Sequence, residues 1–185
     1  MRVFFGLDPD PSCKRAISSW RDRCLGADGR PVPPGNFHVT LAFVGEIDEG
    51  PLERLCGAVD GWAEAAQPGA GSLRLDRVGY WPRPAIFWLG SSAVPESLSA
   101  LALALQKRSV AAGARRDAHD WVPHVTLFRR CRQPPPAPLE TPDIVLDYRH
   151  ITLFESQSGR EGVRYSPLAE WPLGSAAVTP PSSGL

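Results

Sequence analysis

The residues best suited to chemistry in this chain are two histidines, each at the start of the same tetrapeptide. His38 opens His-Val-Thr-Leu over residues 38–41, and His124 opens the same four residues over 124–127. An imidazole has an ordinary pKa of ~6.5, so near neutral pH one ring can accept a proton while another donates one. Such a pair suits an in-line displacement at phosphorus, which needs a base on one side and an acid on the other. We expect no metal and no cofactor for proton transfer of this kind.

Each tetrapeptide also places a threonine beside its histidine if the segment is a β-strand. Side chains alternate between the two faces of a strand, so the histidine and the threonine of one copy share a face. The hydroxyls of Thr40 and Thr126 can hydrogen-bond the non-bridging oxygens of a phosphate. Arg129, which follows the second copy, can supply fixed positive charge to the same group. The sequence therefore predicts a phosphate site made of two His-Thr pairs and one arginine.

A single His-x-Thr pattern recurs often by chance, so the prediction depends on the pairing of two copies. A third match, His150-Ile151-Thr152-Leu153, lies after a proline-rich stretch at 133–142. No helix precedes it, and no arginine follows at the matching offset. We therefore expect His150 to be structural or at the surface.

A repeated order of elements would bring the two copies together. A buried strand over 3–7, a helix that ends before Gly26 and a strand over 37–44 surround the first copy. A strand over 86–89, a helix from Pro95 and a strand over 122–128 surround the second. These two similar β-α-β units predict two lobes that face each other across a pseudo-twofold axis. Further elements are expected as a helix from Pro51 and strands over 73–78, 144–146, 151–155 and 163–165.

The bulk properties fit one ordinary globular domain. The chain has 185 residues, of which 43% are hydrophobic, and its formal net charge is zero. Zero net charge argues against a protein that neutralises many phosphates of long nucleic acid, but it allows a grip on one phosphate. We expect a single domain over 1–173 and a disordered tail over 174–185.

The sequence also bears on location and partners. No apolar run approaches the length needed to span a bilayer. The four cysteines match no CxxC spacing, so we expect reduced thiols in a cytoplasmic protein. Aromatic residues can stack on a base, but more often they pack in a protein, so we leave Tyr80, Trp81 and Tyr165 out of the site. The neutral charge and self-contained domain favour a monomer.

Several segments, in order, carry a resemblance to a known family. They are Arg2–Leu7, Asn36–Glu46, Trp88–Gly90, Pro123–Arg129 and Arg164–Leu168. Together they resemble the bacterial RNA 2',3'-cyclic phosphodiesterases, also called 2'-5' RNA ligases, of the two-histidine phosphoesterase superfamily. The resemblance extends from residue 1 to about residue 173. It implies an α+β bilobal fold in which antiparallel sheets line a central cleft.

The resemblance further implies an activity and a role for each histidine. RNA ends with a 2',3'-cyclic phosphate would be hydrolysed to a 2'-phosphomonoester, and RNA ends would be joined reversibly through a 2'-5' bond. His38 would be the proton donor to the leaving 3' oxygen, and His124 the proton acceptor that activates water. The residues alone leave this assignment open, because a pseudo-symmetric pair looks the same from either side.

Three other hypotheses remain at this point. The chain could be a module that binds RNA ends or nucleotides without chemistry, although intact motifs in both lobes count against that. It could be a phosphodiesterase for another small cyclic phosphate. It could be a zinc protein, although the spacing of its cysteines and histidines does not support one.

Overall fold

The computed structural model describes residues 1–116, 119–159 and 162–174, and its architecture is α+β. The helices are α1 (Pro11–Cys24), α2 (Glu49–Ala66), α3 (Glu96–Ala111) and the short 3-10 helix η1 (Pro34–Asn36). The strands are β1 (Arg2–Leu7), β2 (Arg30–Pro31), β3 (Val39–Glu46), β4 (Gly71–Leu75), β5 (Arg77–Trp81), β6 (Ile86–Gly90), β7 (His124–Arg129), β8 (Ile144–Tyr148), β9 (His150–Gly159) and β10 (Gly162–Pro172).

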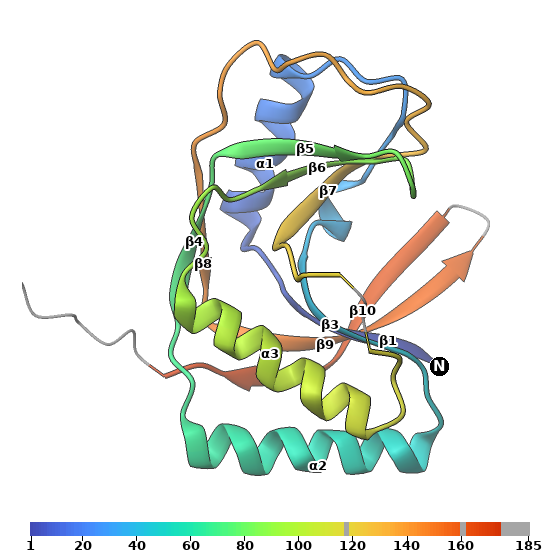
Figure 1. Cartoon of the computed structure of the whole chain (residues 1–185), viewed down its shortest axis with the longest axis vertical. Helices are drawn as coiled ribbons and strands as arrows, with labels where there is room; N and C mark the ends of the chain where they lie inside the picture. The colour runs from blue at the N-terminus through green and yellow to red at the C-terminus, as the bar shows by residue number, and fades with distance from the viewer. Residues whose placement is uncertain (117–118, 160–161, 175–185) are drawn as a thin grey trace, which may run out of the picture.

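Two antiparallel sheets carry the two histidine motifs. One sheet has the order β10-β9-β1-β3, and the other has the order β2-β7-β6-β5. Strands β4 and β8 form a separate antiparallel pair. Figure 1 shows α2 and α3 side by side at one end of the molecule and the β5-β6-β7 ladder at the other. Strands β3 and β7 contact each other, so the two motifs meet where the sheets come together.

The helices are exchanged between the two halves of the fold. Helix α3 follows β6 of the second sheet but packs against β3 of the first, and α1 follows β1 but packs against β8 and η1. The predicted stripe of Leu98, Leu101 and Leu105 is buried, which is worth about 1.5–3 kcal/mol for each side chain. The exchange therefore fixes the sheets relative to one another through apolar packing.

Most predicted elements are present, and capping explains where α1 begins. The Asp10 side chain accepts a hydrogen bond from the backbone N–H of Cys13 at 2.7 Å, as an N-cap should. Gly174, the first residue of the predicted tail, forms a bridge with Gly69. The rest of that tail, 175–185, lies outside the described residues.

The single strand predicted over 73–78 is wrong. The chain leaves the β4–β8 pair at Asp76 and joins the second sheet as β5. The backbone N–H of Asp76 donates to Gly90 at 3.0 Å, and its carboxylate accepts from the backbone and hydroxyl of Ser92. The alternation of residues 73–75 breaks at Asp76 and Arg77, which are both polar, but a break of this kind also fits a bulge within one strand and does not reveal a change of sheet. The closing strands β9 and β10 are also longer than predicted and form the hairpin that projects from the body in Figure 1.

A buried arginine on α1 joins the segments that lead into the two motifs. Arg21 is only 6% exposed, and its Nη1 donates to the carbonyl of Val32 at 2.5 Å. Val32 in turn donates from its backbone N–H to Leu127 in β7 at 2.9 Å. Arg21 is thus connected to the second motif through two successive hydrogen bonds.

The same guanidinium lies against one aromatic ring next to each motif. Its Cζ lies 5.5 Å from the centre of the Phe37 ring and 5.7 Å from that of Phe128. Phe37 immediately precedes His38, and Phe128 lies in β7. Cation–π contacts of desolvated arginines are worth about 2 kcal/mol. Arg21 therefore holds the first motif against the second from behind.

We predict that Arg21→Ala lowers the free energy of unfolding by roughly 2–4 kcal/mol, since truncation leaves a cavity and an unpaired Val32 carbonyl. Urea denaturation of the purified protein measures this loss. Arg23→Ala is the matched control, because Arg23 lies on the same helix and its exposed side chain forms an ion pair with Glu140, at 3.3 Å. Equal, small losses in both variants would contradict the role given to Arg21.

Candidate active site

The two motif histidines are held in the same way. Nδ1 of His38 lies 2.8 Å from the carbonyl oxygen of Asn36, and Nδ1 of His124 lies 2.8 Å from that of Val122. A carbonyl can only accept, so the neutral ring carries its proton on Nδ1. This leaves Nε2 of each ring with a free lone pair. Each imidazole is therefore oriented as a proton acceptor, or as a donor once it is charged.

Aromatic side chains fix both rings further. His38 packs 4.8 Å from Phe4 and edge-on to Tyr165, also at 4.8 Å between ring centres. His124 packs edge-on to Trp81 at 4.6 Å and lies 6.1 Å from Trp88. These rings leave each imidazole partly shielded from water. Tyr165 and Trp81 therefore belong to the site, although the sequence analysis left them out.

A β-bulge brings Arg129 to the same face of β7 as His124. Thr126 is paired with Trp88 and Arg129 with Ile86, while Leu127 is left out of the register. Without this extra residue, strict alternation would send Arg129 to the opposite face. The carbonyl of the bulged Leu127 is not left unpaired, because it accepts from Val32.

Strand β3 has the matching bulge. Leu41 is skipped in the register with β1, so Thr40 and Phe43 lie on one face. Its carbonyl accepts from Nε2 of Gln106 at 3.1 Å. Phe43 thus occupies in the first motif the position that Arg129 occupies in the second. It is 62% exposed, and its ring lies 6.1 Å from that of Phe4, so it offers an apolar surface to a ligand. No local sequence pattern marks Phe43, because its place in the site depends on the bulge.

The two threonine hydroxyls are available to a ligand. Thr126 is 9% exposed, and Thr40 is half-buried. Across the described ranges, neither hydroxyl has a hydrogen-bond partner in the protein. The backbone carbonyl of Thr40 accepts from Nε1 of Trp121 at 2.9 Å. Since Trp121 lies just before the second motif, this bond ties the two motifs directly.

Burial and nearby charge keep both imidazoles neutral. Burial lowers the pKa of His38 to about 4, helped by the positive charges of His124, Arg129 and Lys14 and opposed by the hydrogen bond to Asn36. Burial also lowers the pKa of His124, again with a contribution from Arg129. His124 and Arg129 therefore lie near enough to His38 to affect its charge, and Arg129 lies near enough to His124 to affect the charge of that ring. An anion that binds among them would stabilise a proton on either ring.

His150 lies elsewhere. It is an exposed residue at the start of β9, and it lines a cavity of about 400 Å³ with Lys14, Thr152 and Glu170 among others. It is not among the groups that shift the pKa of His38 or His124. Its exposure agrees with the surface position expected from the sequence.

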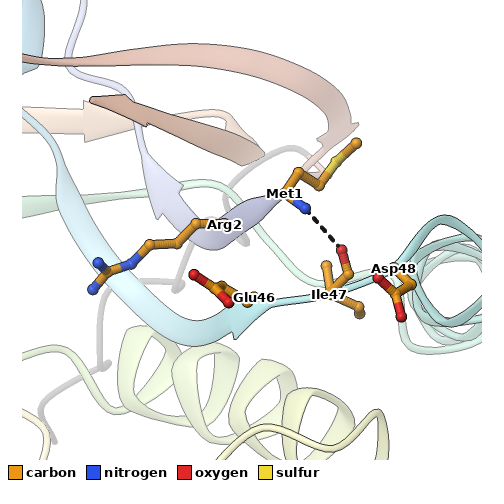
Figure 2. Close-up of a pocket in the computed structure, with 5 residues that line it drawn as sticks. All are labelled: Met1, Arg2, Glu46, Ile47 and Asp48. Atoms are coloured by element: carbon orange, nitrogen blue, oxygen red, sulfur yellow. Dashed lines mark hydrogen bonds between the residues drawn. The ribbon is translucent and has the colours of Figure 1, made fainter. Parts of the chain in front are cut away.

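A second hollow, of about 370 Å³, lies at the ends of β1 and β3 and is lined by Met1, Arg2, Glu46, Ile47 and Asp48. Figure 2 shows the hydrogen bond from the N-terminal amine of Met1 to the carbonyl of Ile47, at 3.0 Å. None of the predicted site residues lines this hollow.

The structure also bears on the metal and membrane questions. The four cysteines are free thiols, and the described residues hold no cluster of histidine, cysteine or acidic side chains that could bind a metal ion. The zinc alternative therefore gains no support from the part of the chain that is described. Among those residues, no helix has the length and apolar character needed to cross a bilayer.

Comparison with known proteins points to one group of enzymes. Residues 7–88 match the family described as LigT like Phosphoesterase. Over 176 residues the chain is 33% identical to an RNA 2',3'-cyclic phosphodiesterase of Escherichia coli K12, covering 93% of this chain and 96% of that protein. It is also 33% identical, over 134 residues, to an RNA 2',3'-cyclic phosphodiesterase of Methanothermobacter thermautotrophicus, covering 70% and 71% of the two chains.

Solved structures agree. The crystal structure of E. coli LigT complexed with 3'-AMP superposes with a TM-score of 0.83 at 30% identity, covering 93% of this chain and 97% of that one. The same protein complexed with phosphate gives a TM-score of 0.78 at 29% identity, with 94% and 97% covered. The α+β fold with antiparallel sheets is therefore shared over nearly the whole chain.

We predict that the His38 imidazole titrates near pH 4 in the free protein, because burial and Arg129 disfavour its charged form. Arg129→Met should raise the pKa of both His38 and His124, since removing a nearby positive charge favours protonation. Imidazole C–H shifts followed by NMR across pH measure both values. Arg132→Met is the control, because Arg132 shifts neither ring. Unchanged pKa values in Arg129→Met would contradict the placement of this arginine.

Proposed function

Because the chain belongs to the LigT-like phosphoesterase family, we propose that it hydrolyses the 2',3'-cyclic phosphate at RNA ends, using His38 and His124 as acid and base. The enzymatic activity is that of an RNA 2',3'-cyclic phosphodiesterase. The observation that carries the proposed mechanism is the pair of imidazoles that each keep a free Nε2 and share one arginine.

In this mechanism the cyclic phosphate lies between the two rings. Nε2 of His124 accepts a proton from a water molecule, whose oxygen forms a new bond to phosphorus. The bond from phosphorus to the 3' oxygen breaks on the opposite side, and protonated His38 gives its proton to that oxygen. The product is a 2'-phosphomonoester with a free 3' hydroxyl. The proton balance is closed when His124 returns its proton and His38 regains one.

The low pKa of His38 suits the role of acid. The pKa of His38 is lowered from the ordinary value for an imidazole to about 4, so its protonated ring gives up the proton readily. The negative charge of the bound substrate raises that pKa while the complex exists, so the ring is loaded with a proton when it is needed. The lowered pKa of His38 does not assign the acid role by itself, because the pKa of His124 is lowered as well. The family resemblance supports giving the acid role to His38.

The remaining predicted residues are assigned to the phosphate. The unpartnered hydroxyls of Thr40 and Thr126 can donate to its non-bridging oxygens, and Arg129 can neutralise charge that develops on them. The exposed ring of Phe43 is free to pack against the nucleoside. Joining of RNA ends would follow the same course with a 5' hydroxyl in place of water: its oxygen bonds to phosphorus, the bond to the 3' oxygen breaks, and a 2'-5' diester forms. In the reverse reaction the 3' hydroxyl attacks phosphorus and the 5' hydroxyl leaves.

The proposed setting follows from the chain itself. Both motifs come from one chain, so the proposed active form is a monomer. Its four free thiols fit a reducing compartment, so we place the enzyme in the cytoplasm. Its partners are then RNA ends that carry a cyclic phosphate.

We predict that the purified protein converts a cyclic-phosphate-ended oligonucleotide to a 2'-phosphate product in the presence of EDTA. His38→Ala and His124→Ala should each lower kcat/KM by about 100-fold or more, which is the usual contribution of one general acid or base. His150→Ala is the matched control and should keep most of the activity, because this histidine is exposed on β9.

Chromatography of the products against 2'- and 3'-phosphate standards measures the outcome. A 3'-phosphate product would reverse the acid and base assignment. A fully active single mutant at either motif would refute the paired scheme. Tight binding of the cyclic phosphate without turnover would favour the binding-module hypothesis instead.

A further inference from the structure

The face of the β5-β6-β7 sheet on which His124 lies also carries an arginine that the mechanism does not use. Arg77 on β5 is paired with Gly90 on β6, and Gly90 is paired with His124 on β7. Residues directly opposite in an antiparallel sheet share a face, and strands lie about 4.7–4.9 Å apart. The backbone of Arg77 is therefore on the order of 10 Å from that of His124, along one row of this sheet face.

The indole of Trp88 lies between Arg77 and His124 on this face of the sheet. The ring of Trp88 lies 6.1 Å from that of His124, and the Cζ of Arg77 lies 5.3 Å from the centre of the Trp88 ring. A Cβ at Gly79 or at Gly90 would overlap the atoms of this indole. The two glycines thus let the ring lie flat against the sheet and carry the guanidinium above it. Trp88 is 4% exposed, so its position is well fixed by packing.

Arg77 differs from Arg74 and Arg23 in what it contacts. Arg74 is paired with Asp143 at 2.7 Å, and Arg23 with Glu140 at 3.3 Å. Arg77 is exposed. Among residues 1–116, 119–159 and 162–174, the one side-chain contact of its guanidinium is the cation–π contact with the Trp88 ring. A guanidinium stacked on a ring keeps its charge, and its N–H groups at the edge are still able to donate. Such a fork matches the geometry of a phosphate.

We propose that Arg77 binds the phosphate on the 5' side of the nucleotide whose cyclic phosphate is opened. This inference rests on the proposed function, because it places the reacting phosphorus between His38 and His124. A single arginine already serves that phosphorus from the far end of the same sheet face, so Arg77 is free for the next phosphate. The ribose then spans the row over the Trp88 indole, which lies against Gly90.

With this contact, the enzyme recognises the 5' phosphate of its substrate as well as the nucleoside that carries the cyclic phosphate. Two kinds of molecule supply a phosphate at this position: RNA, through an internal phosphodiester, and a free nucleotide, through its 5'-phosphomonoester. Three substrates separate these sources: a nucleoside 2',3'-cyclic phosphate with a 5' hydroxyl, the same compound with a 5' phosphate, and a dinucleotide that ends in the cyclic phosphate. A preference for the second alone would identify free nucleotides, and a preference for the third would identify RNA.

We predict that the wild-type protein has a higher kcat/KM for a substrate with a 5' phosphate group than for the one with a 5' hydroxyl. In Arg77→Met the ratio of these two values should fall by about tenfold, as expected for loss of one charge-assisted contact. Methionine keeps an apolar chain over Trp88, so the packing of the sheet face is retained. Arg77→Lys should recover part of the ratio, because it restores a charge without the planar fork.

The control variant is Arg54→Met, which removes the same charge from an exposed position on α2, away from the cleft. Its ratio should equal that of the wild type. An unchanged ratio in Arg77→Met, including an equal loss for all three substrates, would overturn the proposal and leave Arg77 as a support for Trp88. Absence of any turnover by the wild type would instead refute the proposed function. Calorimetric binding of a nucleoside 2'-phosphate with and without a 5' phosphate then tests Arg77 separately.

Discussion

The hydrogen bond from each imidazole Nδ1 to a backbone carbonyl two residues earlier decides what the cleft can do. It fixes the tautomer of His38 and of His124, so that the basic nitrogen of each ring is the one not bonded to the protein. A ring held in this way can rotate little, and the edge-on contacts with Tyr165 and Trp81 restrict it further. Chemistry on opposite sides of one phosphorus atom needs this fixed orientation, because each proton must move along a defined line.

The rest of the fold sets how these two rings face each other. The motifs lie in different sheets, so their separation depends on contacts that cross between them. Arg21 links the residues around both motifs from behind, and Trp121 donates to the first motif from the loop that leads into the second. The exchange of α1 and α3 adds apolar packing to these bonds. A small displacement in any of these contacts would change the distance between the two imidazoles. Catalytic activity is very sensitive to that distance.

The sequence is enough to predict the site's chemistry but not its full membership. Two His-Val-Thr-Leu copies in matching surroundings predict His38 and His124, because the strand period and the repeat are both local patterns. Arg129, which the sequence predicts, and Phe43, which it does not, reach the site only because each strand carries a bulge, and a bulge depends on the partner strand as well as on its own residues. The split of the predicted 73–78 strand at Asp76 has the same origin, since the choice between two sheets is made by tertiary contacts. Tyr165 and Trp81 lie far from the motifs in sequence, so no local pattern could have placed them beside the imidazoles.

Burial and positive charge act together on the two histidines, and both favour the neutral ring in the empty site. The negative charge of a bound substrate favours the protonated ring instead, so the bound phosphate itself promotes protonation of the acid, His38. The most direct measurement is a crystal structure with vanadate and a nucleoside bound, because vanadate adopts the five-coordinate geometry of an in-line displacement. We expect Nε2 of His38 on one apical oxygen and Nε2 of His124 on the other. Both imidazoles on the same side of the vanadium, or either one turned away from it, would contradict the account.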